Sequence, residues 1–328
     1  MTPTPSDVHV NAPLTQISVA FLQSPNGFVA SRVFPTVNVG KQSDRYYVYD
    51  RGEFNRDEMA LRAPATESAG SSYTLDNTPT YYAPIYALHK DIPDEVRANA
   101  DAMLNPDRET TEFLTIKTLI KKEKLWAAKY FTGGVWTTDQ DGVSGSPSTN
   151  QVKQWNDSTS TPVQDVRSAA TGILQRTGFK PNKLVIGKPV YDALADHPGI
   201  MDRIKYGASP GAPAIVTLQA LAALFEVDTI EVMTAIENTA NEGATAAHSF
   251  IGGKKALLCY AAPSPGLMTP SAGYTFAWTG MFGGDAAGIR IRTFRMENLK
   301  SDRVEVEYAF DQKLVAADLG AFWDSVVA

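Results

Sequence analysis

The sequence is poor in cysteine and histidine. It contains one cysteine, Cys259, and four histidines among 328 residues. A single cysteine excludes an intrachain disulfide and a thiolate metal cluster built from one chain, and the pattern is typical of a reducing compartment. The histidines, at positions 9, 89, 197 and 248, are far apart and have no partner at metal-ligand spacing. We therefore expect no redox centre, no metal site and no cofactor.

Motifs of the common enzyme classes are missing too. The segment Gly252 to Lys255 has neither the spacing of a phosphate-binding loop nor the Ser or Thr that follows its lysine, and we interpret it as a turn. Gly280 to Gly284 has the wrong register for a nucleophile elbow or a dinucleotide-binding turn. His197 precedes Pro198 at a predicted helix break, which favours a structural role over a catalytic one. The sequence predicts a protein that is not an enzyme.

The chain also lacks an excess of positive charge. It has 30 Lys and Arg against 36 Asp and Glu, a formal net charge of -6. Tight nucleic-acid binding needs many contacts between cations and phosphates, so a DNA-binding module is not expected. The most apolar N-terminal stretch, Ile17 to Leu22, is too short for a membrane span and follows no cationic segment. We expect no targeting signal and no membrane partner.

The first forty residues combine low charge with many apolar side chains. Their formally charged residues are Asp7 and Arg32, and their apolar side chains are too numerous for a disordered tail. Prolines and glycines interrupt any long helix or strand in this stretch. We interpret residues 1–40 as an extended arm that needs a surface to lie on.

A tyrosine-rich hairpin is predicted over residues 41–90. Its strands are Arg45 to Tyr49 and the aromatic run from Tyr73 to Leu88, joined by a charged irregular stretch from Arg51 to Gly70. Seven of the 13 tyrosines lie between Tyr46 and Tyr86. An isolated two-stranded ribbon is marginal in water, so its aromatic faces, with Tyr46, Tyr47 and Tyr49, require a partner surface. That surface is either another subunit or the ribbon's own subunit.

The rest of the chain predicts helices followed by an α/β unit and a β unit. A long helix resumes at Asp107, after a break at Asn105-Pro106, and continues to Tyr130. Helices and buried strands alternate over residues 162–262 and imply a compact α/β domain. Near the end, a strand over residues 303–311 alternates apolar and charged residues and pairs with a strand over 288–296. We expect the apolar stripe of the long helix to be Phe113, Ile116, Leu119, Ile120 and Trp126, and the residues from Leu314 to Trp323 to form a short apolar tail.

The order of these parts resembles the major capsid proteins of tailed double-stranded-DNA bacteriophages, which share the Hong Kong 97 phage-type capsid fold. Four long segments carry the resemblance: Asn11 to Gly52, His89 to Ala127, Lys183 to Tyr206 and Ile289 to Trp323. The resemblance implies an α+β fold with an N-terminal arm (1–40), an extended β-hairpin loop (41–90), a peripheral domain with a spine helix (91–161), an axial domain (162–280), and the long strands and C-terminal tail of the peripheral domain (281–328).

The resemblance also implies a function. Such subunits assemble into hexamers and pentamers of an icosahedral shell around the phage genome, first as a procapsid that matures as DNA is packaged. The implied partners are other copies of the chain, a scaffolding protein, a portal, and in some members a maturation protease or a decoration protein. Packaged DNA would be held loosely and nonspecifically. The location would be the virion, after the host cytoplasm.

Charged residues of the extended loop are then candidate intersubunit contacts that set register more than affinity. They are Arg51, Glu53, Arg56, Asp57, Glu58, Arg62 and Glu67. The name-giving member crosslinks a loop lysine to a neighbouring asparagine, but no lysine occurs here from Gln42 to His89. We therefore predict noncovalent locking.

Two other interpretations stay open. An encapsulin-type nanocompartment uses the same fold around cargo enzymes. From a different class, residues 162–262 are compatible with a soluble enzyme or ligand-binding protein, which would be a monomer with a deep polar pocket.

Overall fold

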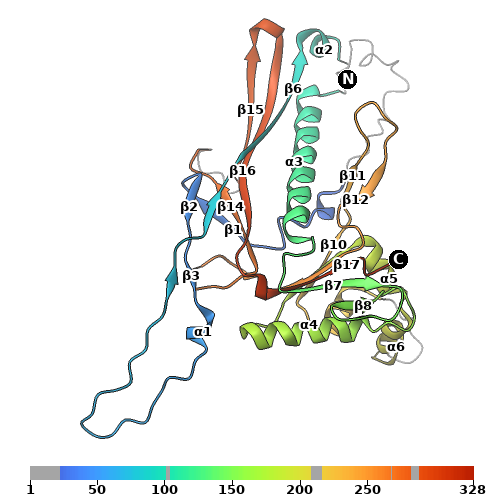
Figure 1. Cartoon of the computed structure of the whole chain (residues 1–328). Helices are drawn as coiled ribbons and strands as arrows, with labels where there is room; N and C mark the ends of the chain where they lie inside the picture. The colour runs from blue at the N-terminus through green and yellow to red at the C-terminus, as the bar shows by residue number, and fades with distance from the viewer. Residues whose placement is uncertain (1–22, 101–103, 208–215, 267, 282–287) are drawn as a thin grey trace.

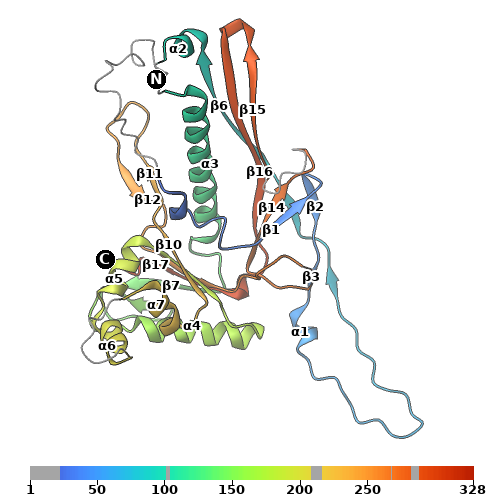
Figure 2. The ribbon, with the colours of Figure 1, turned by 180° about the vertical axis from the view of Figure 1, so that it is seen from behind.

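A computed structural model describes residues 23–100, 104–207, 216–266, 268–281 and 288–328. The predicted α+β class is confirmed. An elongated part, built on one long helix and a β-ribbon, stands on a part built on a six-stranded sheet (Figure 1). A long loop projects away from both parts, as the view from behind also shows (Figure 2).

The elongated part is a three-stranded ribbon packed along helix α3. Its strands are β6 (Ile85–Pro93), β15 (Ile289–Met296) and β16 (Ser301–Leu314), and β16 pairs antiparallel with both others. The predicted hairpin is confirmed, and its alternation holds from Arg303 to Tyr308, where Val304, Val306 and Tyr308 are buried between partly exposed charged neighbours. Beyond Tyr308 the alternation ends, because Ala309, Phe310 and Asp311 are all buried. Val304 and Val306 pack with Ile92 and with Leu114 of α3.

Helix α3 (Pro106–Tyr130) begins where the sequence predicted. The Asn105 side chain accepts a hydrogen bond from the Arg108 N–H at 3.0 Å, and Pro106 occupies the first turn, where a missing N–H costs nothing. The helix α2 (Asp94–Ala98) precedes this break.

Of the predicted apolar stripe of α3, only Trp126 is fully buried. The buried positions are Thr110, Leu114, Lys122, Glu123, Trp126 and Tyr130. Phe113 is 44% exposed, and the ammonium groups of Lys90 and Lys117 lie over its ring. Ile116, Leu119 and Ile120 are half-buried. Two charged residues, Lys122 and Glu123, share the covered face with Leu114 and Trp126, which hydrophobic periodicity does not predict.

The second part is a six-stranded sheet with helices on one face. Its order is β10-β9-β13-β17-β7-β8. The strands are β7 (Thr138–Val143), β8 (Gln151–Lys153), β9 (Lys183–Gly187), β10 (Thr229–Met233), β13 (Ala256–Cys259) and β17 (Gly320–Asp324), and the helices are α4 (Pro162–Thr177), α5 (Lys188–Ala195), α6 (Pro198–Gly207) and α7 (Leu218–Phe225). The helices and strands predicted between 162 and 262 are found, and β7 and β8 add two strands from before that range.

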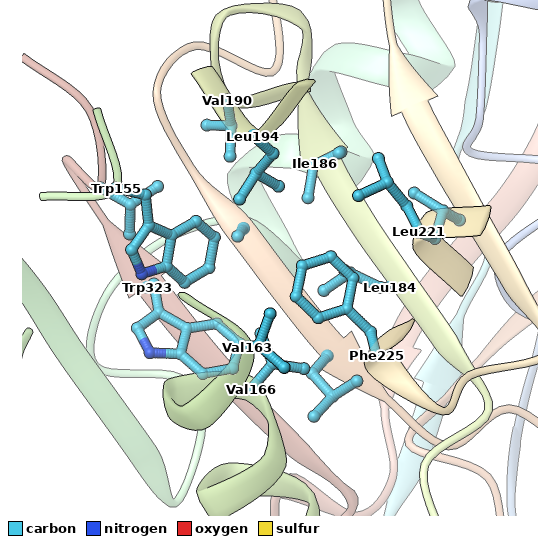
Figure 3. Packing of buried hydrophobic residues seen from close by; sticks show 14 of the residues in the cluster. Trp155, Val163, Val166, Leu184, Ile186, Val190, Leu194, Leu221, Phe225 and Trp323 are labelled. Carbon is cyan, nitrogen blue, oxygen red and sulfur yellow. The ribbon is translucent and has the colours of Figure 1, made fainter. Parts of the chain in front are cut away.

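Strand β17 corrects the expectation of a short apolar tail. It lies inside the sheet, antiparallel to β13 and parallel to β7. Trp323 is fully buried, and its ring centroid is 5.7 Å from that of Trp155. Figure 3 shows these two rings beside Val163 and Val166 of α4 and near Phe225 of α7. The end of the chain therefore completes the core.

The described part of the predicted arm also belongs to a core. Strand β1 (Thr36–Val39) pairs in parallel with β14 (Gly273–Trp278). Val29, Ala30, Val33 and Phe34 are at most 2% exposed and pack against α3 and one face of the six-stranded sheet. The surface that the predicted arm needs is therefore supplied by its own subunit at these four residues. The prediction for residues 1–22 lies outside the described residues.

Two adjacent charged residues of α3 hold this part of the arm. The Glu123 carboxylate accepts hydrogen bonds from the N–H groups of Val29 (3.0 and 3.1 Å) and Ala30 (2.8 Å). The Lys122 ammonium donates to the Ser31 hydroxyl at 2.9 Å. Burial raises the pKa of the Glu123 carboxyl, although the two backbone N–H groups oppose that rise.

Four shorter features of the described residues lie outside the projecting loop. They are the 3₁₀ turns Pro25–Gly27, Glu297–Leu299 and Ala317–Leu319, and the hairpin of β11 (Ile236–Asn238) and β12 (His248–Phe250).

Replacing Glu123 with Gln should lower the free energy of unfolding by about 1–3 kcal/mol at neutral pH. The amide keeps one acceptor oxygen but turns an N–H₂ group towards backbone donors. Urea unfolding of the unassembled subunit measures the loss. Glu112→Gln is the control, because Glu112 pairs with Arg108 on the exposed face of α3, and it should cost less than about 0.5 kcal/mol. Equal midpoints for the two variants would contradict the assigned role of Glu123.

Candidate contact surface on the projecting loop

The projecting loop is held by two short strand pairs. Strand β2 (Ser43–Arg45) pairs with β5 (Thr80–Tyr82), and β3 (Val48–Tyr49) pairs with β4 (Leu75–Asp76). From Met59 to Thr78 every residue is exposed. The loop leaves the rest of the subunit beyond β3 (Figures 1 and 2). The subunit itself covers little of this segment.

The base of the loop packs on its own subunit. Tyr81 is 6% exposed and stacks on Phe276 of β14, with ring centroids 4.6 Å apart and an interplanar angle of 9°. Tyr46 stacks on the same ring at 5.7 Å, and burial, with a smaller contribution from Asp311, raises the pKa of its phenol. At the base, then, an aromatic partner surface is present within the subunit.

Asp311 joins the base to α3. Its carboxylate accepts a hydrogen bond from the Tyr82 N–H at 3.1 Å and pairs with the Lys129 ammonium at 2.6 Å. The residue lies just beyond Ala309, the last β16 residue paired with β6. A buried carboxylate thus binds the loop backbone where the β6–β16 ladder ends.

Further out, the predicted contact residues Arg51, Glu53 and Tyr49 make contacts within the chain. Arg51 begins the short helix α1 (Arg51–Phe54), and its guanidinium pairs with Asp318 at 2.7 Å. The Glu53 carboxylate accepts hydrogen bonds from the N–H and hydroxyl groups of Thr74 across the hairpin. The Tyr49 ring contacts Phe54 and Tyr73, at centroid distances of 5.9 and 6.0 Å.

The other predicted contact residues remain available to a partner. Arg56 and Glu58 form a loose pair at 3.6 Å. Asp57, Arg62 and Glu67 are exposed and make no hydrogen bond or ion pair with another described residue. Tyr47 is 58% exposed.

Two residues that the sequence reasoning passed over stand out on the loop. The Met59 side chain is 96% exposed, and that of Leu61 is fully exposed. Covering large aliphatic side chains by a partner contributes binding free energy in proportion to the apolar area removed from water. The sequence signal that could have identified Met59 and Leu61 is their position in a charged stretch that has no strand periodicity and so offers them no core.

The described residues contain little else that suggests chemistry. No three of their His, Cys, Asp or Glu side chains form a group able to hold a metal ion. Cys259 is buried, and burial raises the pKa of its thiol to about 12. His197 is buried, with its ring 3.2 Å from the Ser160 hydroxyl and accepting a hydrogen bond from the Gly199 N–H. None of the described helices has both the length and the apolar character of a bilayer span.

Known proteins share both sequence and fold with this chain. The major capsid protein of Pseudomonas phage JBD67 is 26% identical over 322 residues and is covered to 97%, as is this chain. A phage-related protein from Bordetella bronchiseptica RB50 superposes with a TM-score of 0.68 at 20% identity over 93% of each chain. The capsid structure of cyanophage P-SCSP1u gives 0.59 at 10% identity over 98% of each chain.

An encapsulin also shares the fold. The SrpI encapsulin of Synechococcus elongatus PCC 7942 gives a TM-score of 0.56 at 12% identity, over 97% of this chain and 92% of its own. The solved structures therefore show the Hong Kong 97 phage-type fold without separating phage shells from nanocompartments. The sequence profile of one family does separate them, because it matches residues 96–272, more than half of the chain. The chain belongs to the phage major capsid protein E family.

Proposed function

We propose that this major capsid protein assembles into hexamers and pentamers that close an icosahedral shell around double-stranded DNA, without covalent crosslinks. The observation that carries the proposal is the loop from Met59 to Thr78, exposed throughout and bearing two bare aliphatic side chains. Ordering a backbone costs about 1–2 kcal/mol per residue, which contacts within this subunit do not offset. A neighbouring subunit supplies the missing surface.

The charged side chains of the loop set register across that contact. Arg56, Asp57, Glu58, Arg62 and Glu67 carry charges of both signs and are exposed or loosely paired. Solvated pairs of this kind add little affinity but disfavour misaligned partners. Arg51 and Glu53 act differently, since their contacts lie within the chain and fix the direction of the loop.

Functional units follow from the same proposal. We assign an arm (1–40), an extended loop (41–90), a peripheral domain (91–161 and 281–328) and an axial domain (162–280). Strands β7, β8 and β17 come from the two peripheral segments yet lie in the sheet built on β9, β10 and β13. The chain therefore passes between the two domains several times, which couples them mechanically.

Further partners belong to the proposal as well. The subunit would meet a scaffolding protein and a portal in the host cytoplasm, and a maturation protease or decoration protein where the phage encodes one. The net charge of -6 supports loose, nonspecific contact with packaged DNA, because a shell must release its genome.

The double substitution of Met59 and Leu61 with Ser should abolish most shell closure. Both side chains touch little of their own subunit, so urea unfolding of the unassembled protein should change by less than about 0.5 kcal/mol. Sedimentation velocity and negative-stain microscopy measure closed shells. Ala60→Ser in the same loop is the control and should assemble normally. Wild-type yields of closed shells from the double variant would refute the proposed contact.

Adjacent tyrosines provide a second test. Tyr46→Ala should lower the free energy of unfolding of the unassembled subunit by about 1–3 kcal/mol, because the ring is half-buried on Phe276. Tyr47→Ala should leave that stability unchanged and reduce shell yield. Urea titration and sedimentation separate the two effects. The assignment fails if Tyr47→Ala destabilises the subunit as much as Tyr46→Ala.

Noncovalent locking predicts that mature particles dissociate completely in hot detergent. Denaturing electrophoresis should show single chains of 35.5 kDa, since no loop lysine between Gln42 and His89 can form an isopeptide bond. Intact mass spectrometry serves as the control for partial crosslinking. A ladder of dimers and higher multiples would contradict the proposal.

A further inference from the structure

A cavity of about 190 Å³ lies between α3, the described arm and the β-ribbon. It is large enough for several water molecules, each of which takes about 30 Å³ in the liquid. Its lining residues are Ser31, Thr36, Thr118, Leu119, Lys122, Ile289 and Tyr308. The loop contacts described above do not use it.

Lys122 gives the cavity a cation with spare donors. The residue is 7% exposed, and its ammonium donates to the Ser31 hydroxyl at 2.9 Å and lies 5.3 Å from the centre of the Tyr308 ring. An ammonium has three N–H donors, and the described residues offer no second acceptor within hydrogen-bond distance. Burial lowers the pKa of this amine to about 8. At neutral pH most of the group is still charged and poorly solvated.

The other walls define which anion would fit. The hydroxyl groups of Ser31 and Thr36 add polar contacts, and the Thr118 hydroxyl donates to the Leu114 carbonyl. Leu119, Ile289 and the Tyr308 ring form an apolar side. One lysine and no arginine match a single negative charge better than the double charge of phosphate. The apolar side favours a ligand whose charge is attached to a short hydrocarbon stem.

We propose that this cavity binds a carboxylate group carried on a short aliphatic stem, with the Lys122 ammonium as its counter-ion. Two sources share that chemistry: an acidic side chain of a second copy of the chain, and a free small carboxylate. Binding supplies the missing acceptor to a buried cation at the junction of arm, helix and ribbon. It therefore stabilises the contact of α3 with the arm.

Butyrate is the probe for the site itself. Titrating it into the unassembled, ¹⁵N-lysine-labelled subunit at pH 7 should shift the Lys122 ammonium resonance saturably, while the neutral isostere butyramide leaves it unchanged. Lys122→Met should weaken butyrate binding measured by calorimetry roughly ten- to hundredfold, as expected for loss of a charge-assisted hydrogen bond. Lys121→Met is the matched control on the exposed side of α3 and should bind like the wild type. Inorganic phosphate should bind more weakly than butyrate.

Shells treated with a water-soluble carbodiimide distinguish the two sources. An amide bond between Lys122 and an Asp or Glu of a second copy, identified by mass spectrometry, assigns the carboxylate to the neighbour. Lys122 that stays uncoupled in shells while butyrate binds the subunit assigns it to a free ligand. The proposal is overturned if butyrate leaves the Lys122 resonance unmoved, or if butyramide moves it equally. Neither result depends on how the loop locks the shell.

Discussion

The packing of the subunit depends on hydrogen bonds to the backbone of residues 28–34, a turn that belongs to no sheet or long helix. Within residues 28–34, Val29, Ala30, Val33 and Phe34 are buried between α3 and the six-stranded sheet, so their backbone polar groups need partners in the protein, whereas Ser31 and Arg32 are exposed. The Glu123 carboxylate takes the N–H groups of Val29 and Ala30, and the Lys183 ammonium of β9 donates to the carbonyls of Arg32 and Val33. Glu123 of α3, in the elongated part, and Lys183 of β9, in the six-stranded sheet, thereby fix the turn that lies between these two parts.

The sheet strands show how one core serves both parts. Along β9, Leu184 and Ile186 face the helices α4, α5 and α7, whereas Val185 faces the arm and α3. Strand β17 repeats the pattern, with Trp323 on the helix side and Phe322 on the arm side. Because successive side chains of a strand point to opposite faces, a single sheet binds two layers at once. Fixing the arm therefore also fixes α3 and the ribbon against this sheet.

Local sequence signals predicted where helices and strands occur. The burial of charged side chains and the pairing of strands depend on contacts between residues far apart in the sequence. The Asn105-Pro106 break and the alternation along β16 follow from capping and strand periodicity, and both were confirmed. The burial of Glu123 could not be read from the sequence, because its acceptor role depends on N–H groups more than ninety residues away. Likewise, β17 looked like a tail until its partners β13 and β7 were known. On the loop, charge and tyrosine marked the segment, but Arg51 was found paired within the chain and Met59 was passed over.

The composition of the loop reflects two opposing demands on a shell subunit. Before assembly, exposed aliphatic side chains promote aggregation, so two of them among many charged and polar residues keep the free chain soluble. In the contact proposed above, the same two side chains would gain burial after assembly, while the surrounding charges would disfavour misaligned partners. A contact of this size is weak on its own, because association and ordering consume most of its gain. In the proposed shell each subunit would both offer a loop and receive one, so that many weak contacts act together and misplaced subunits can still leave during growth. Strong individual locks would stabilise the errors as firmly as the correct shell.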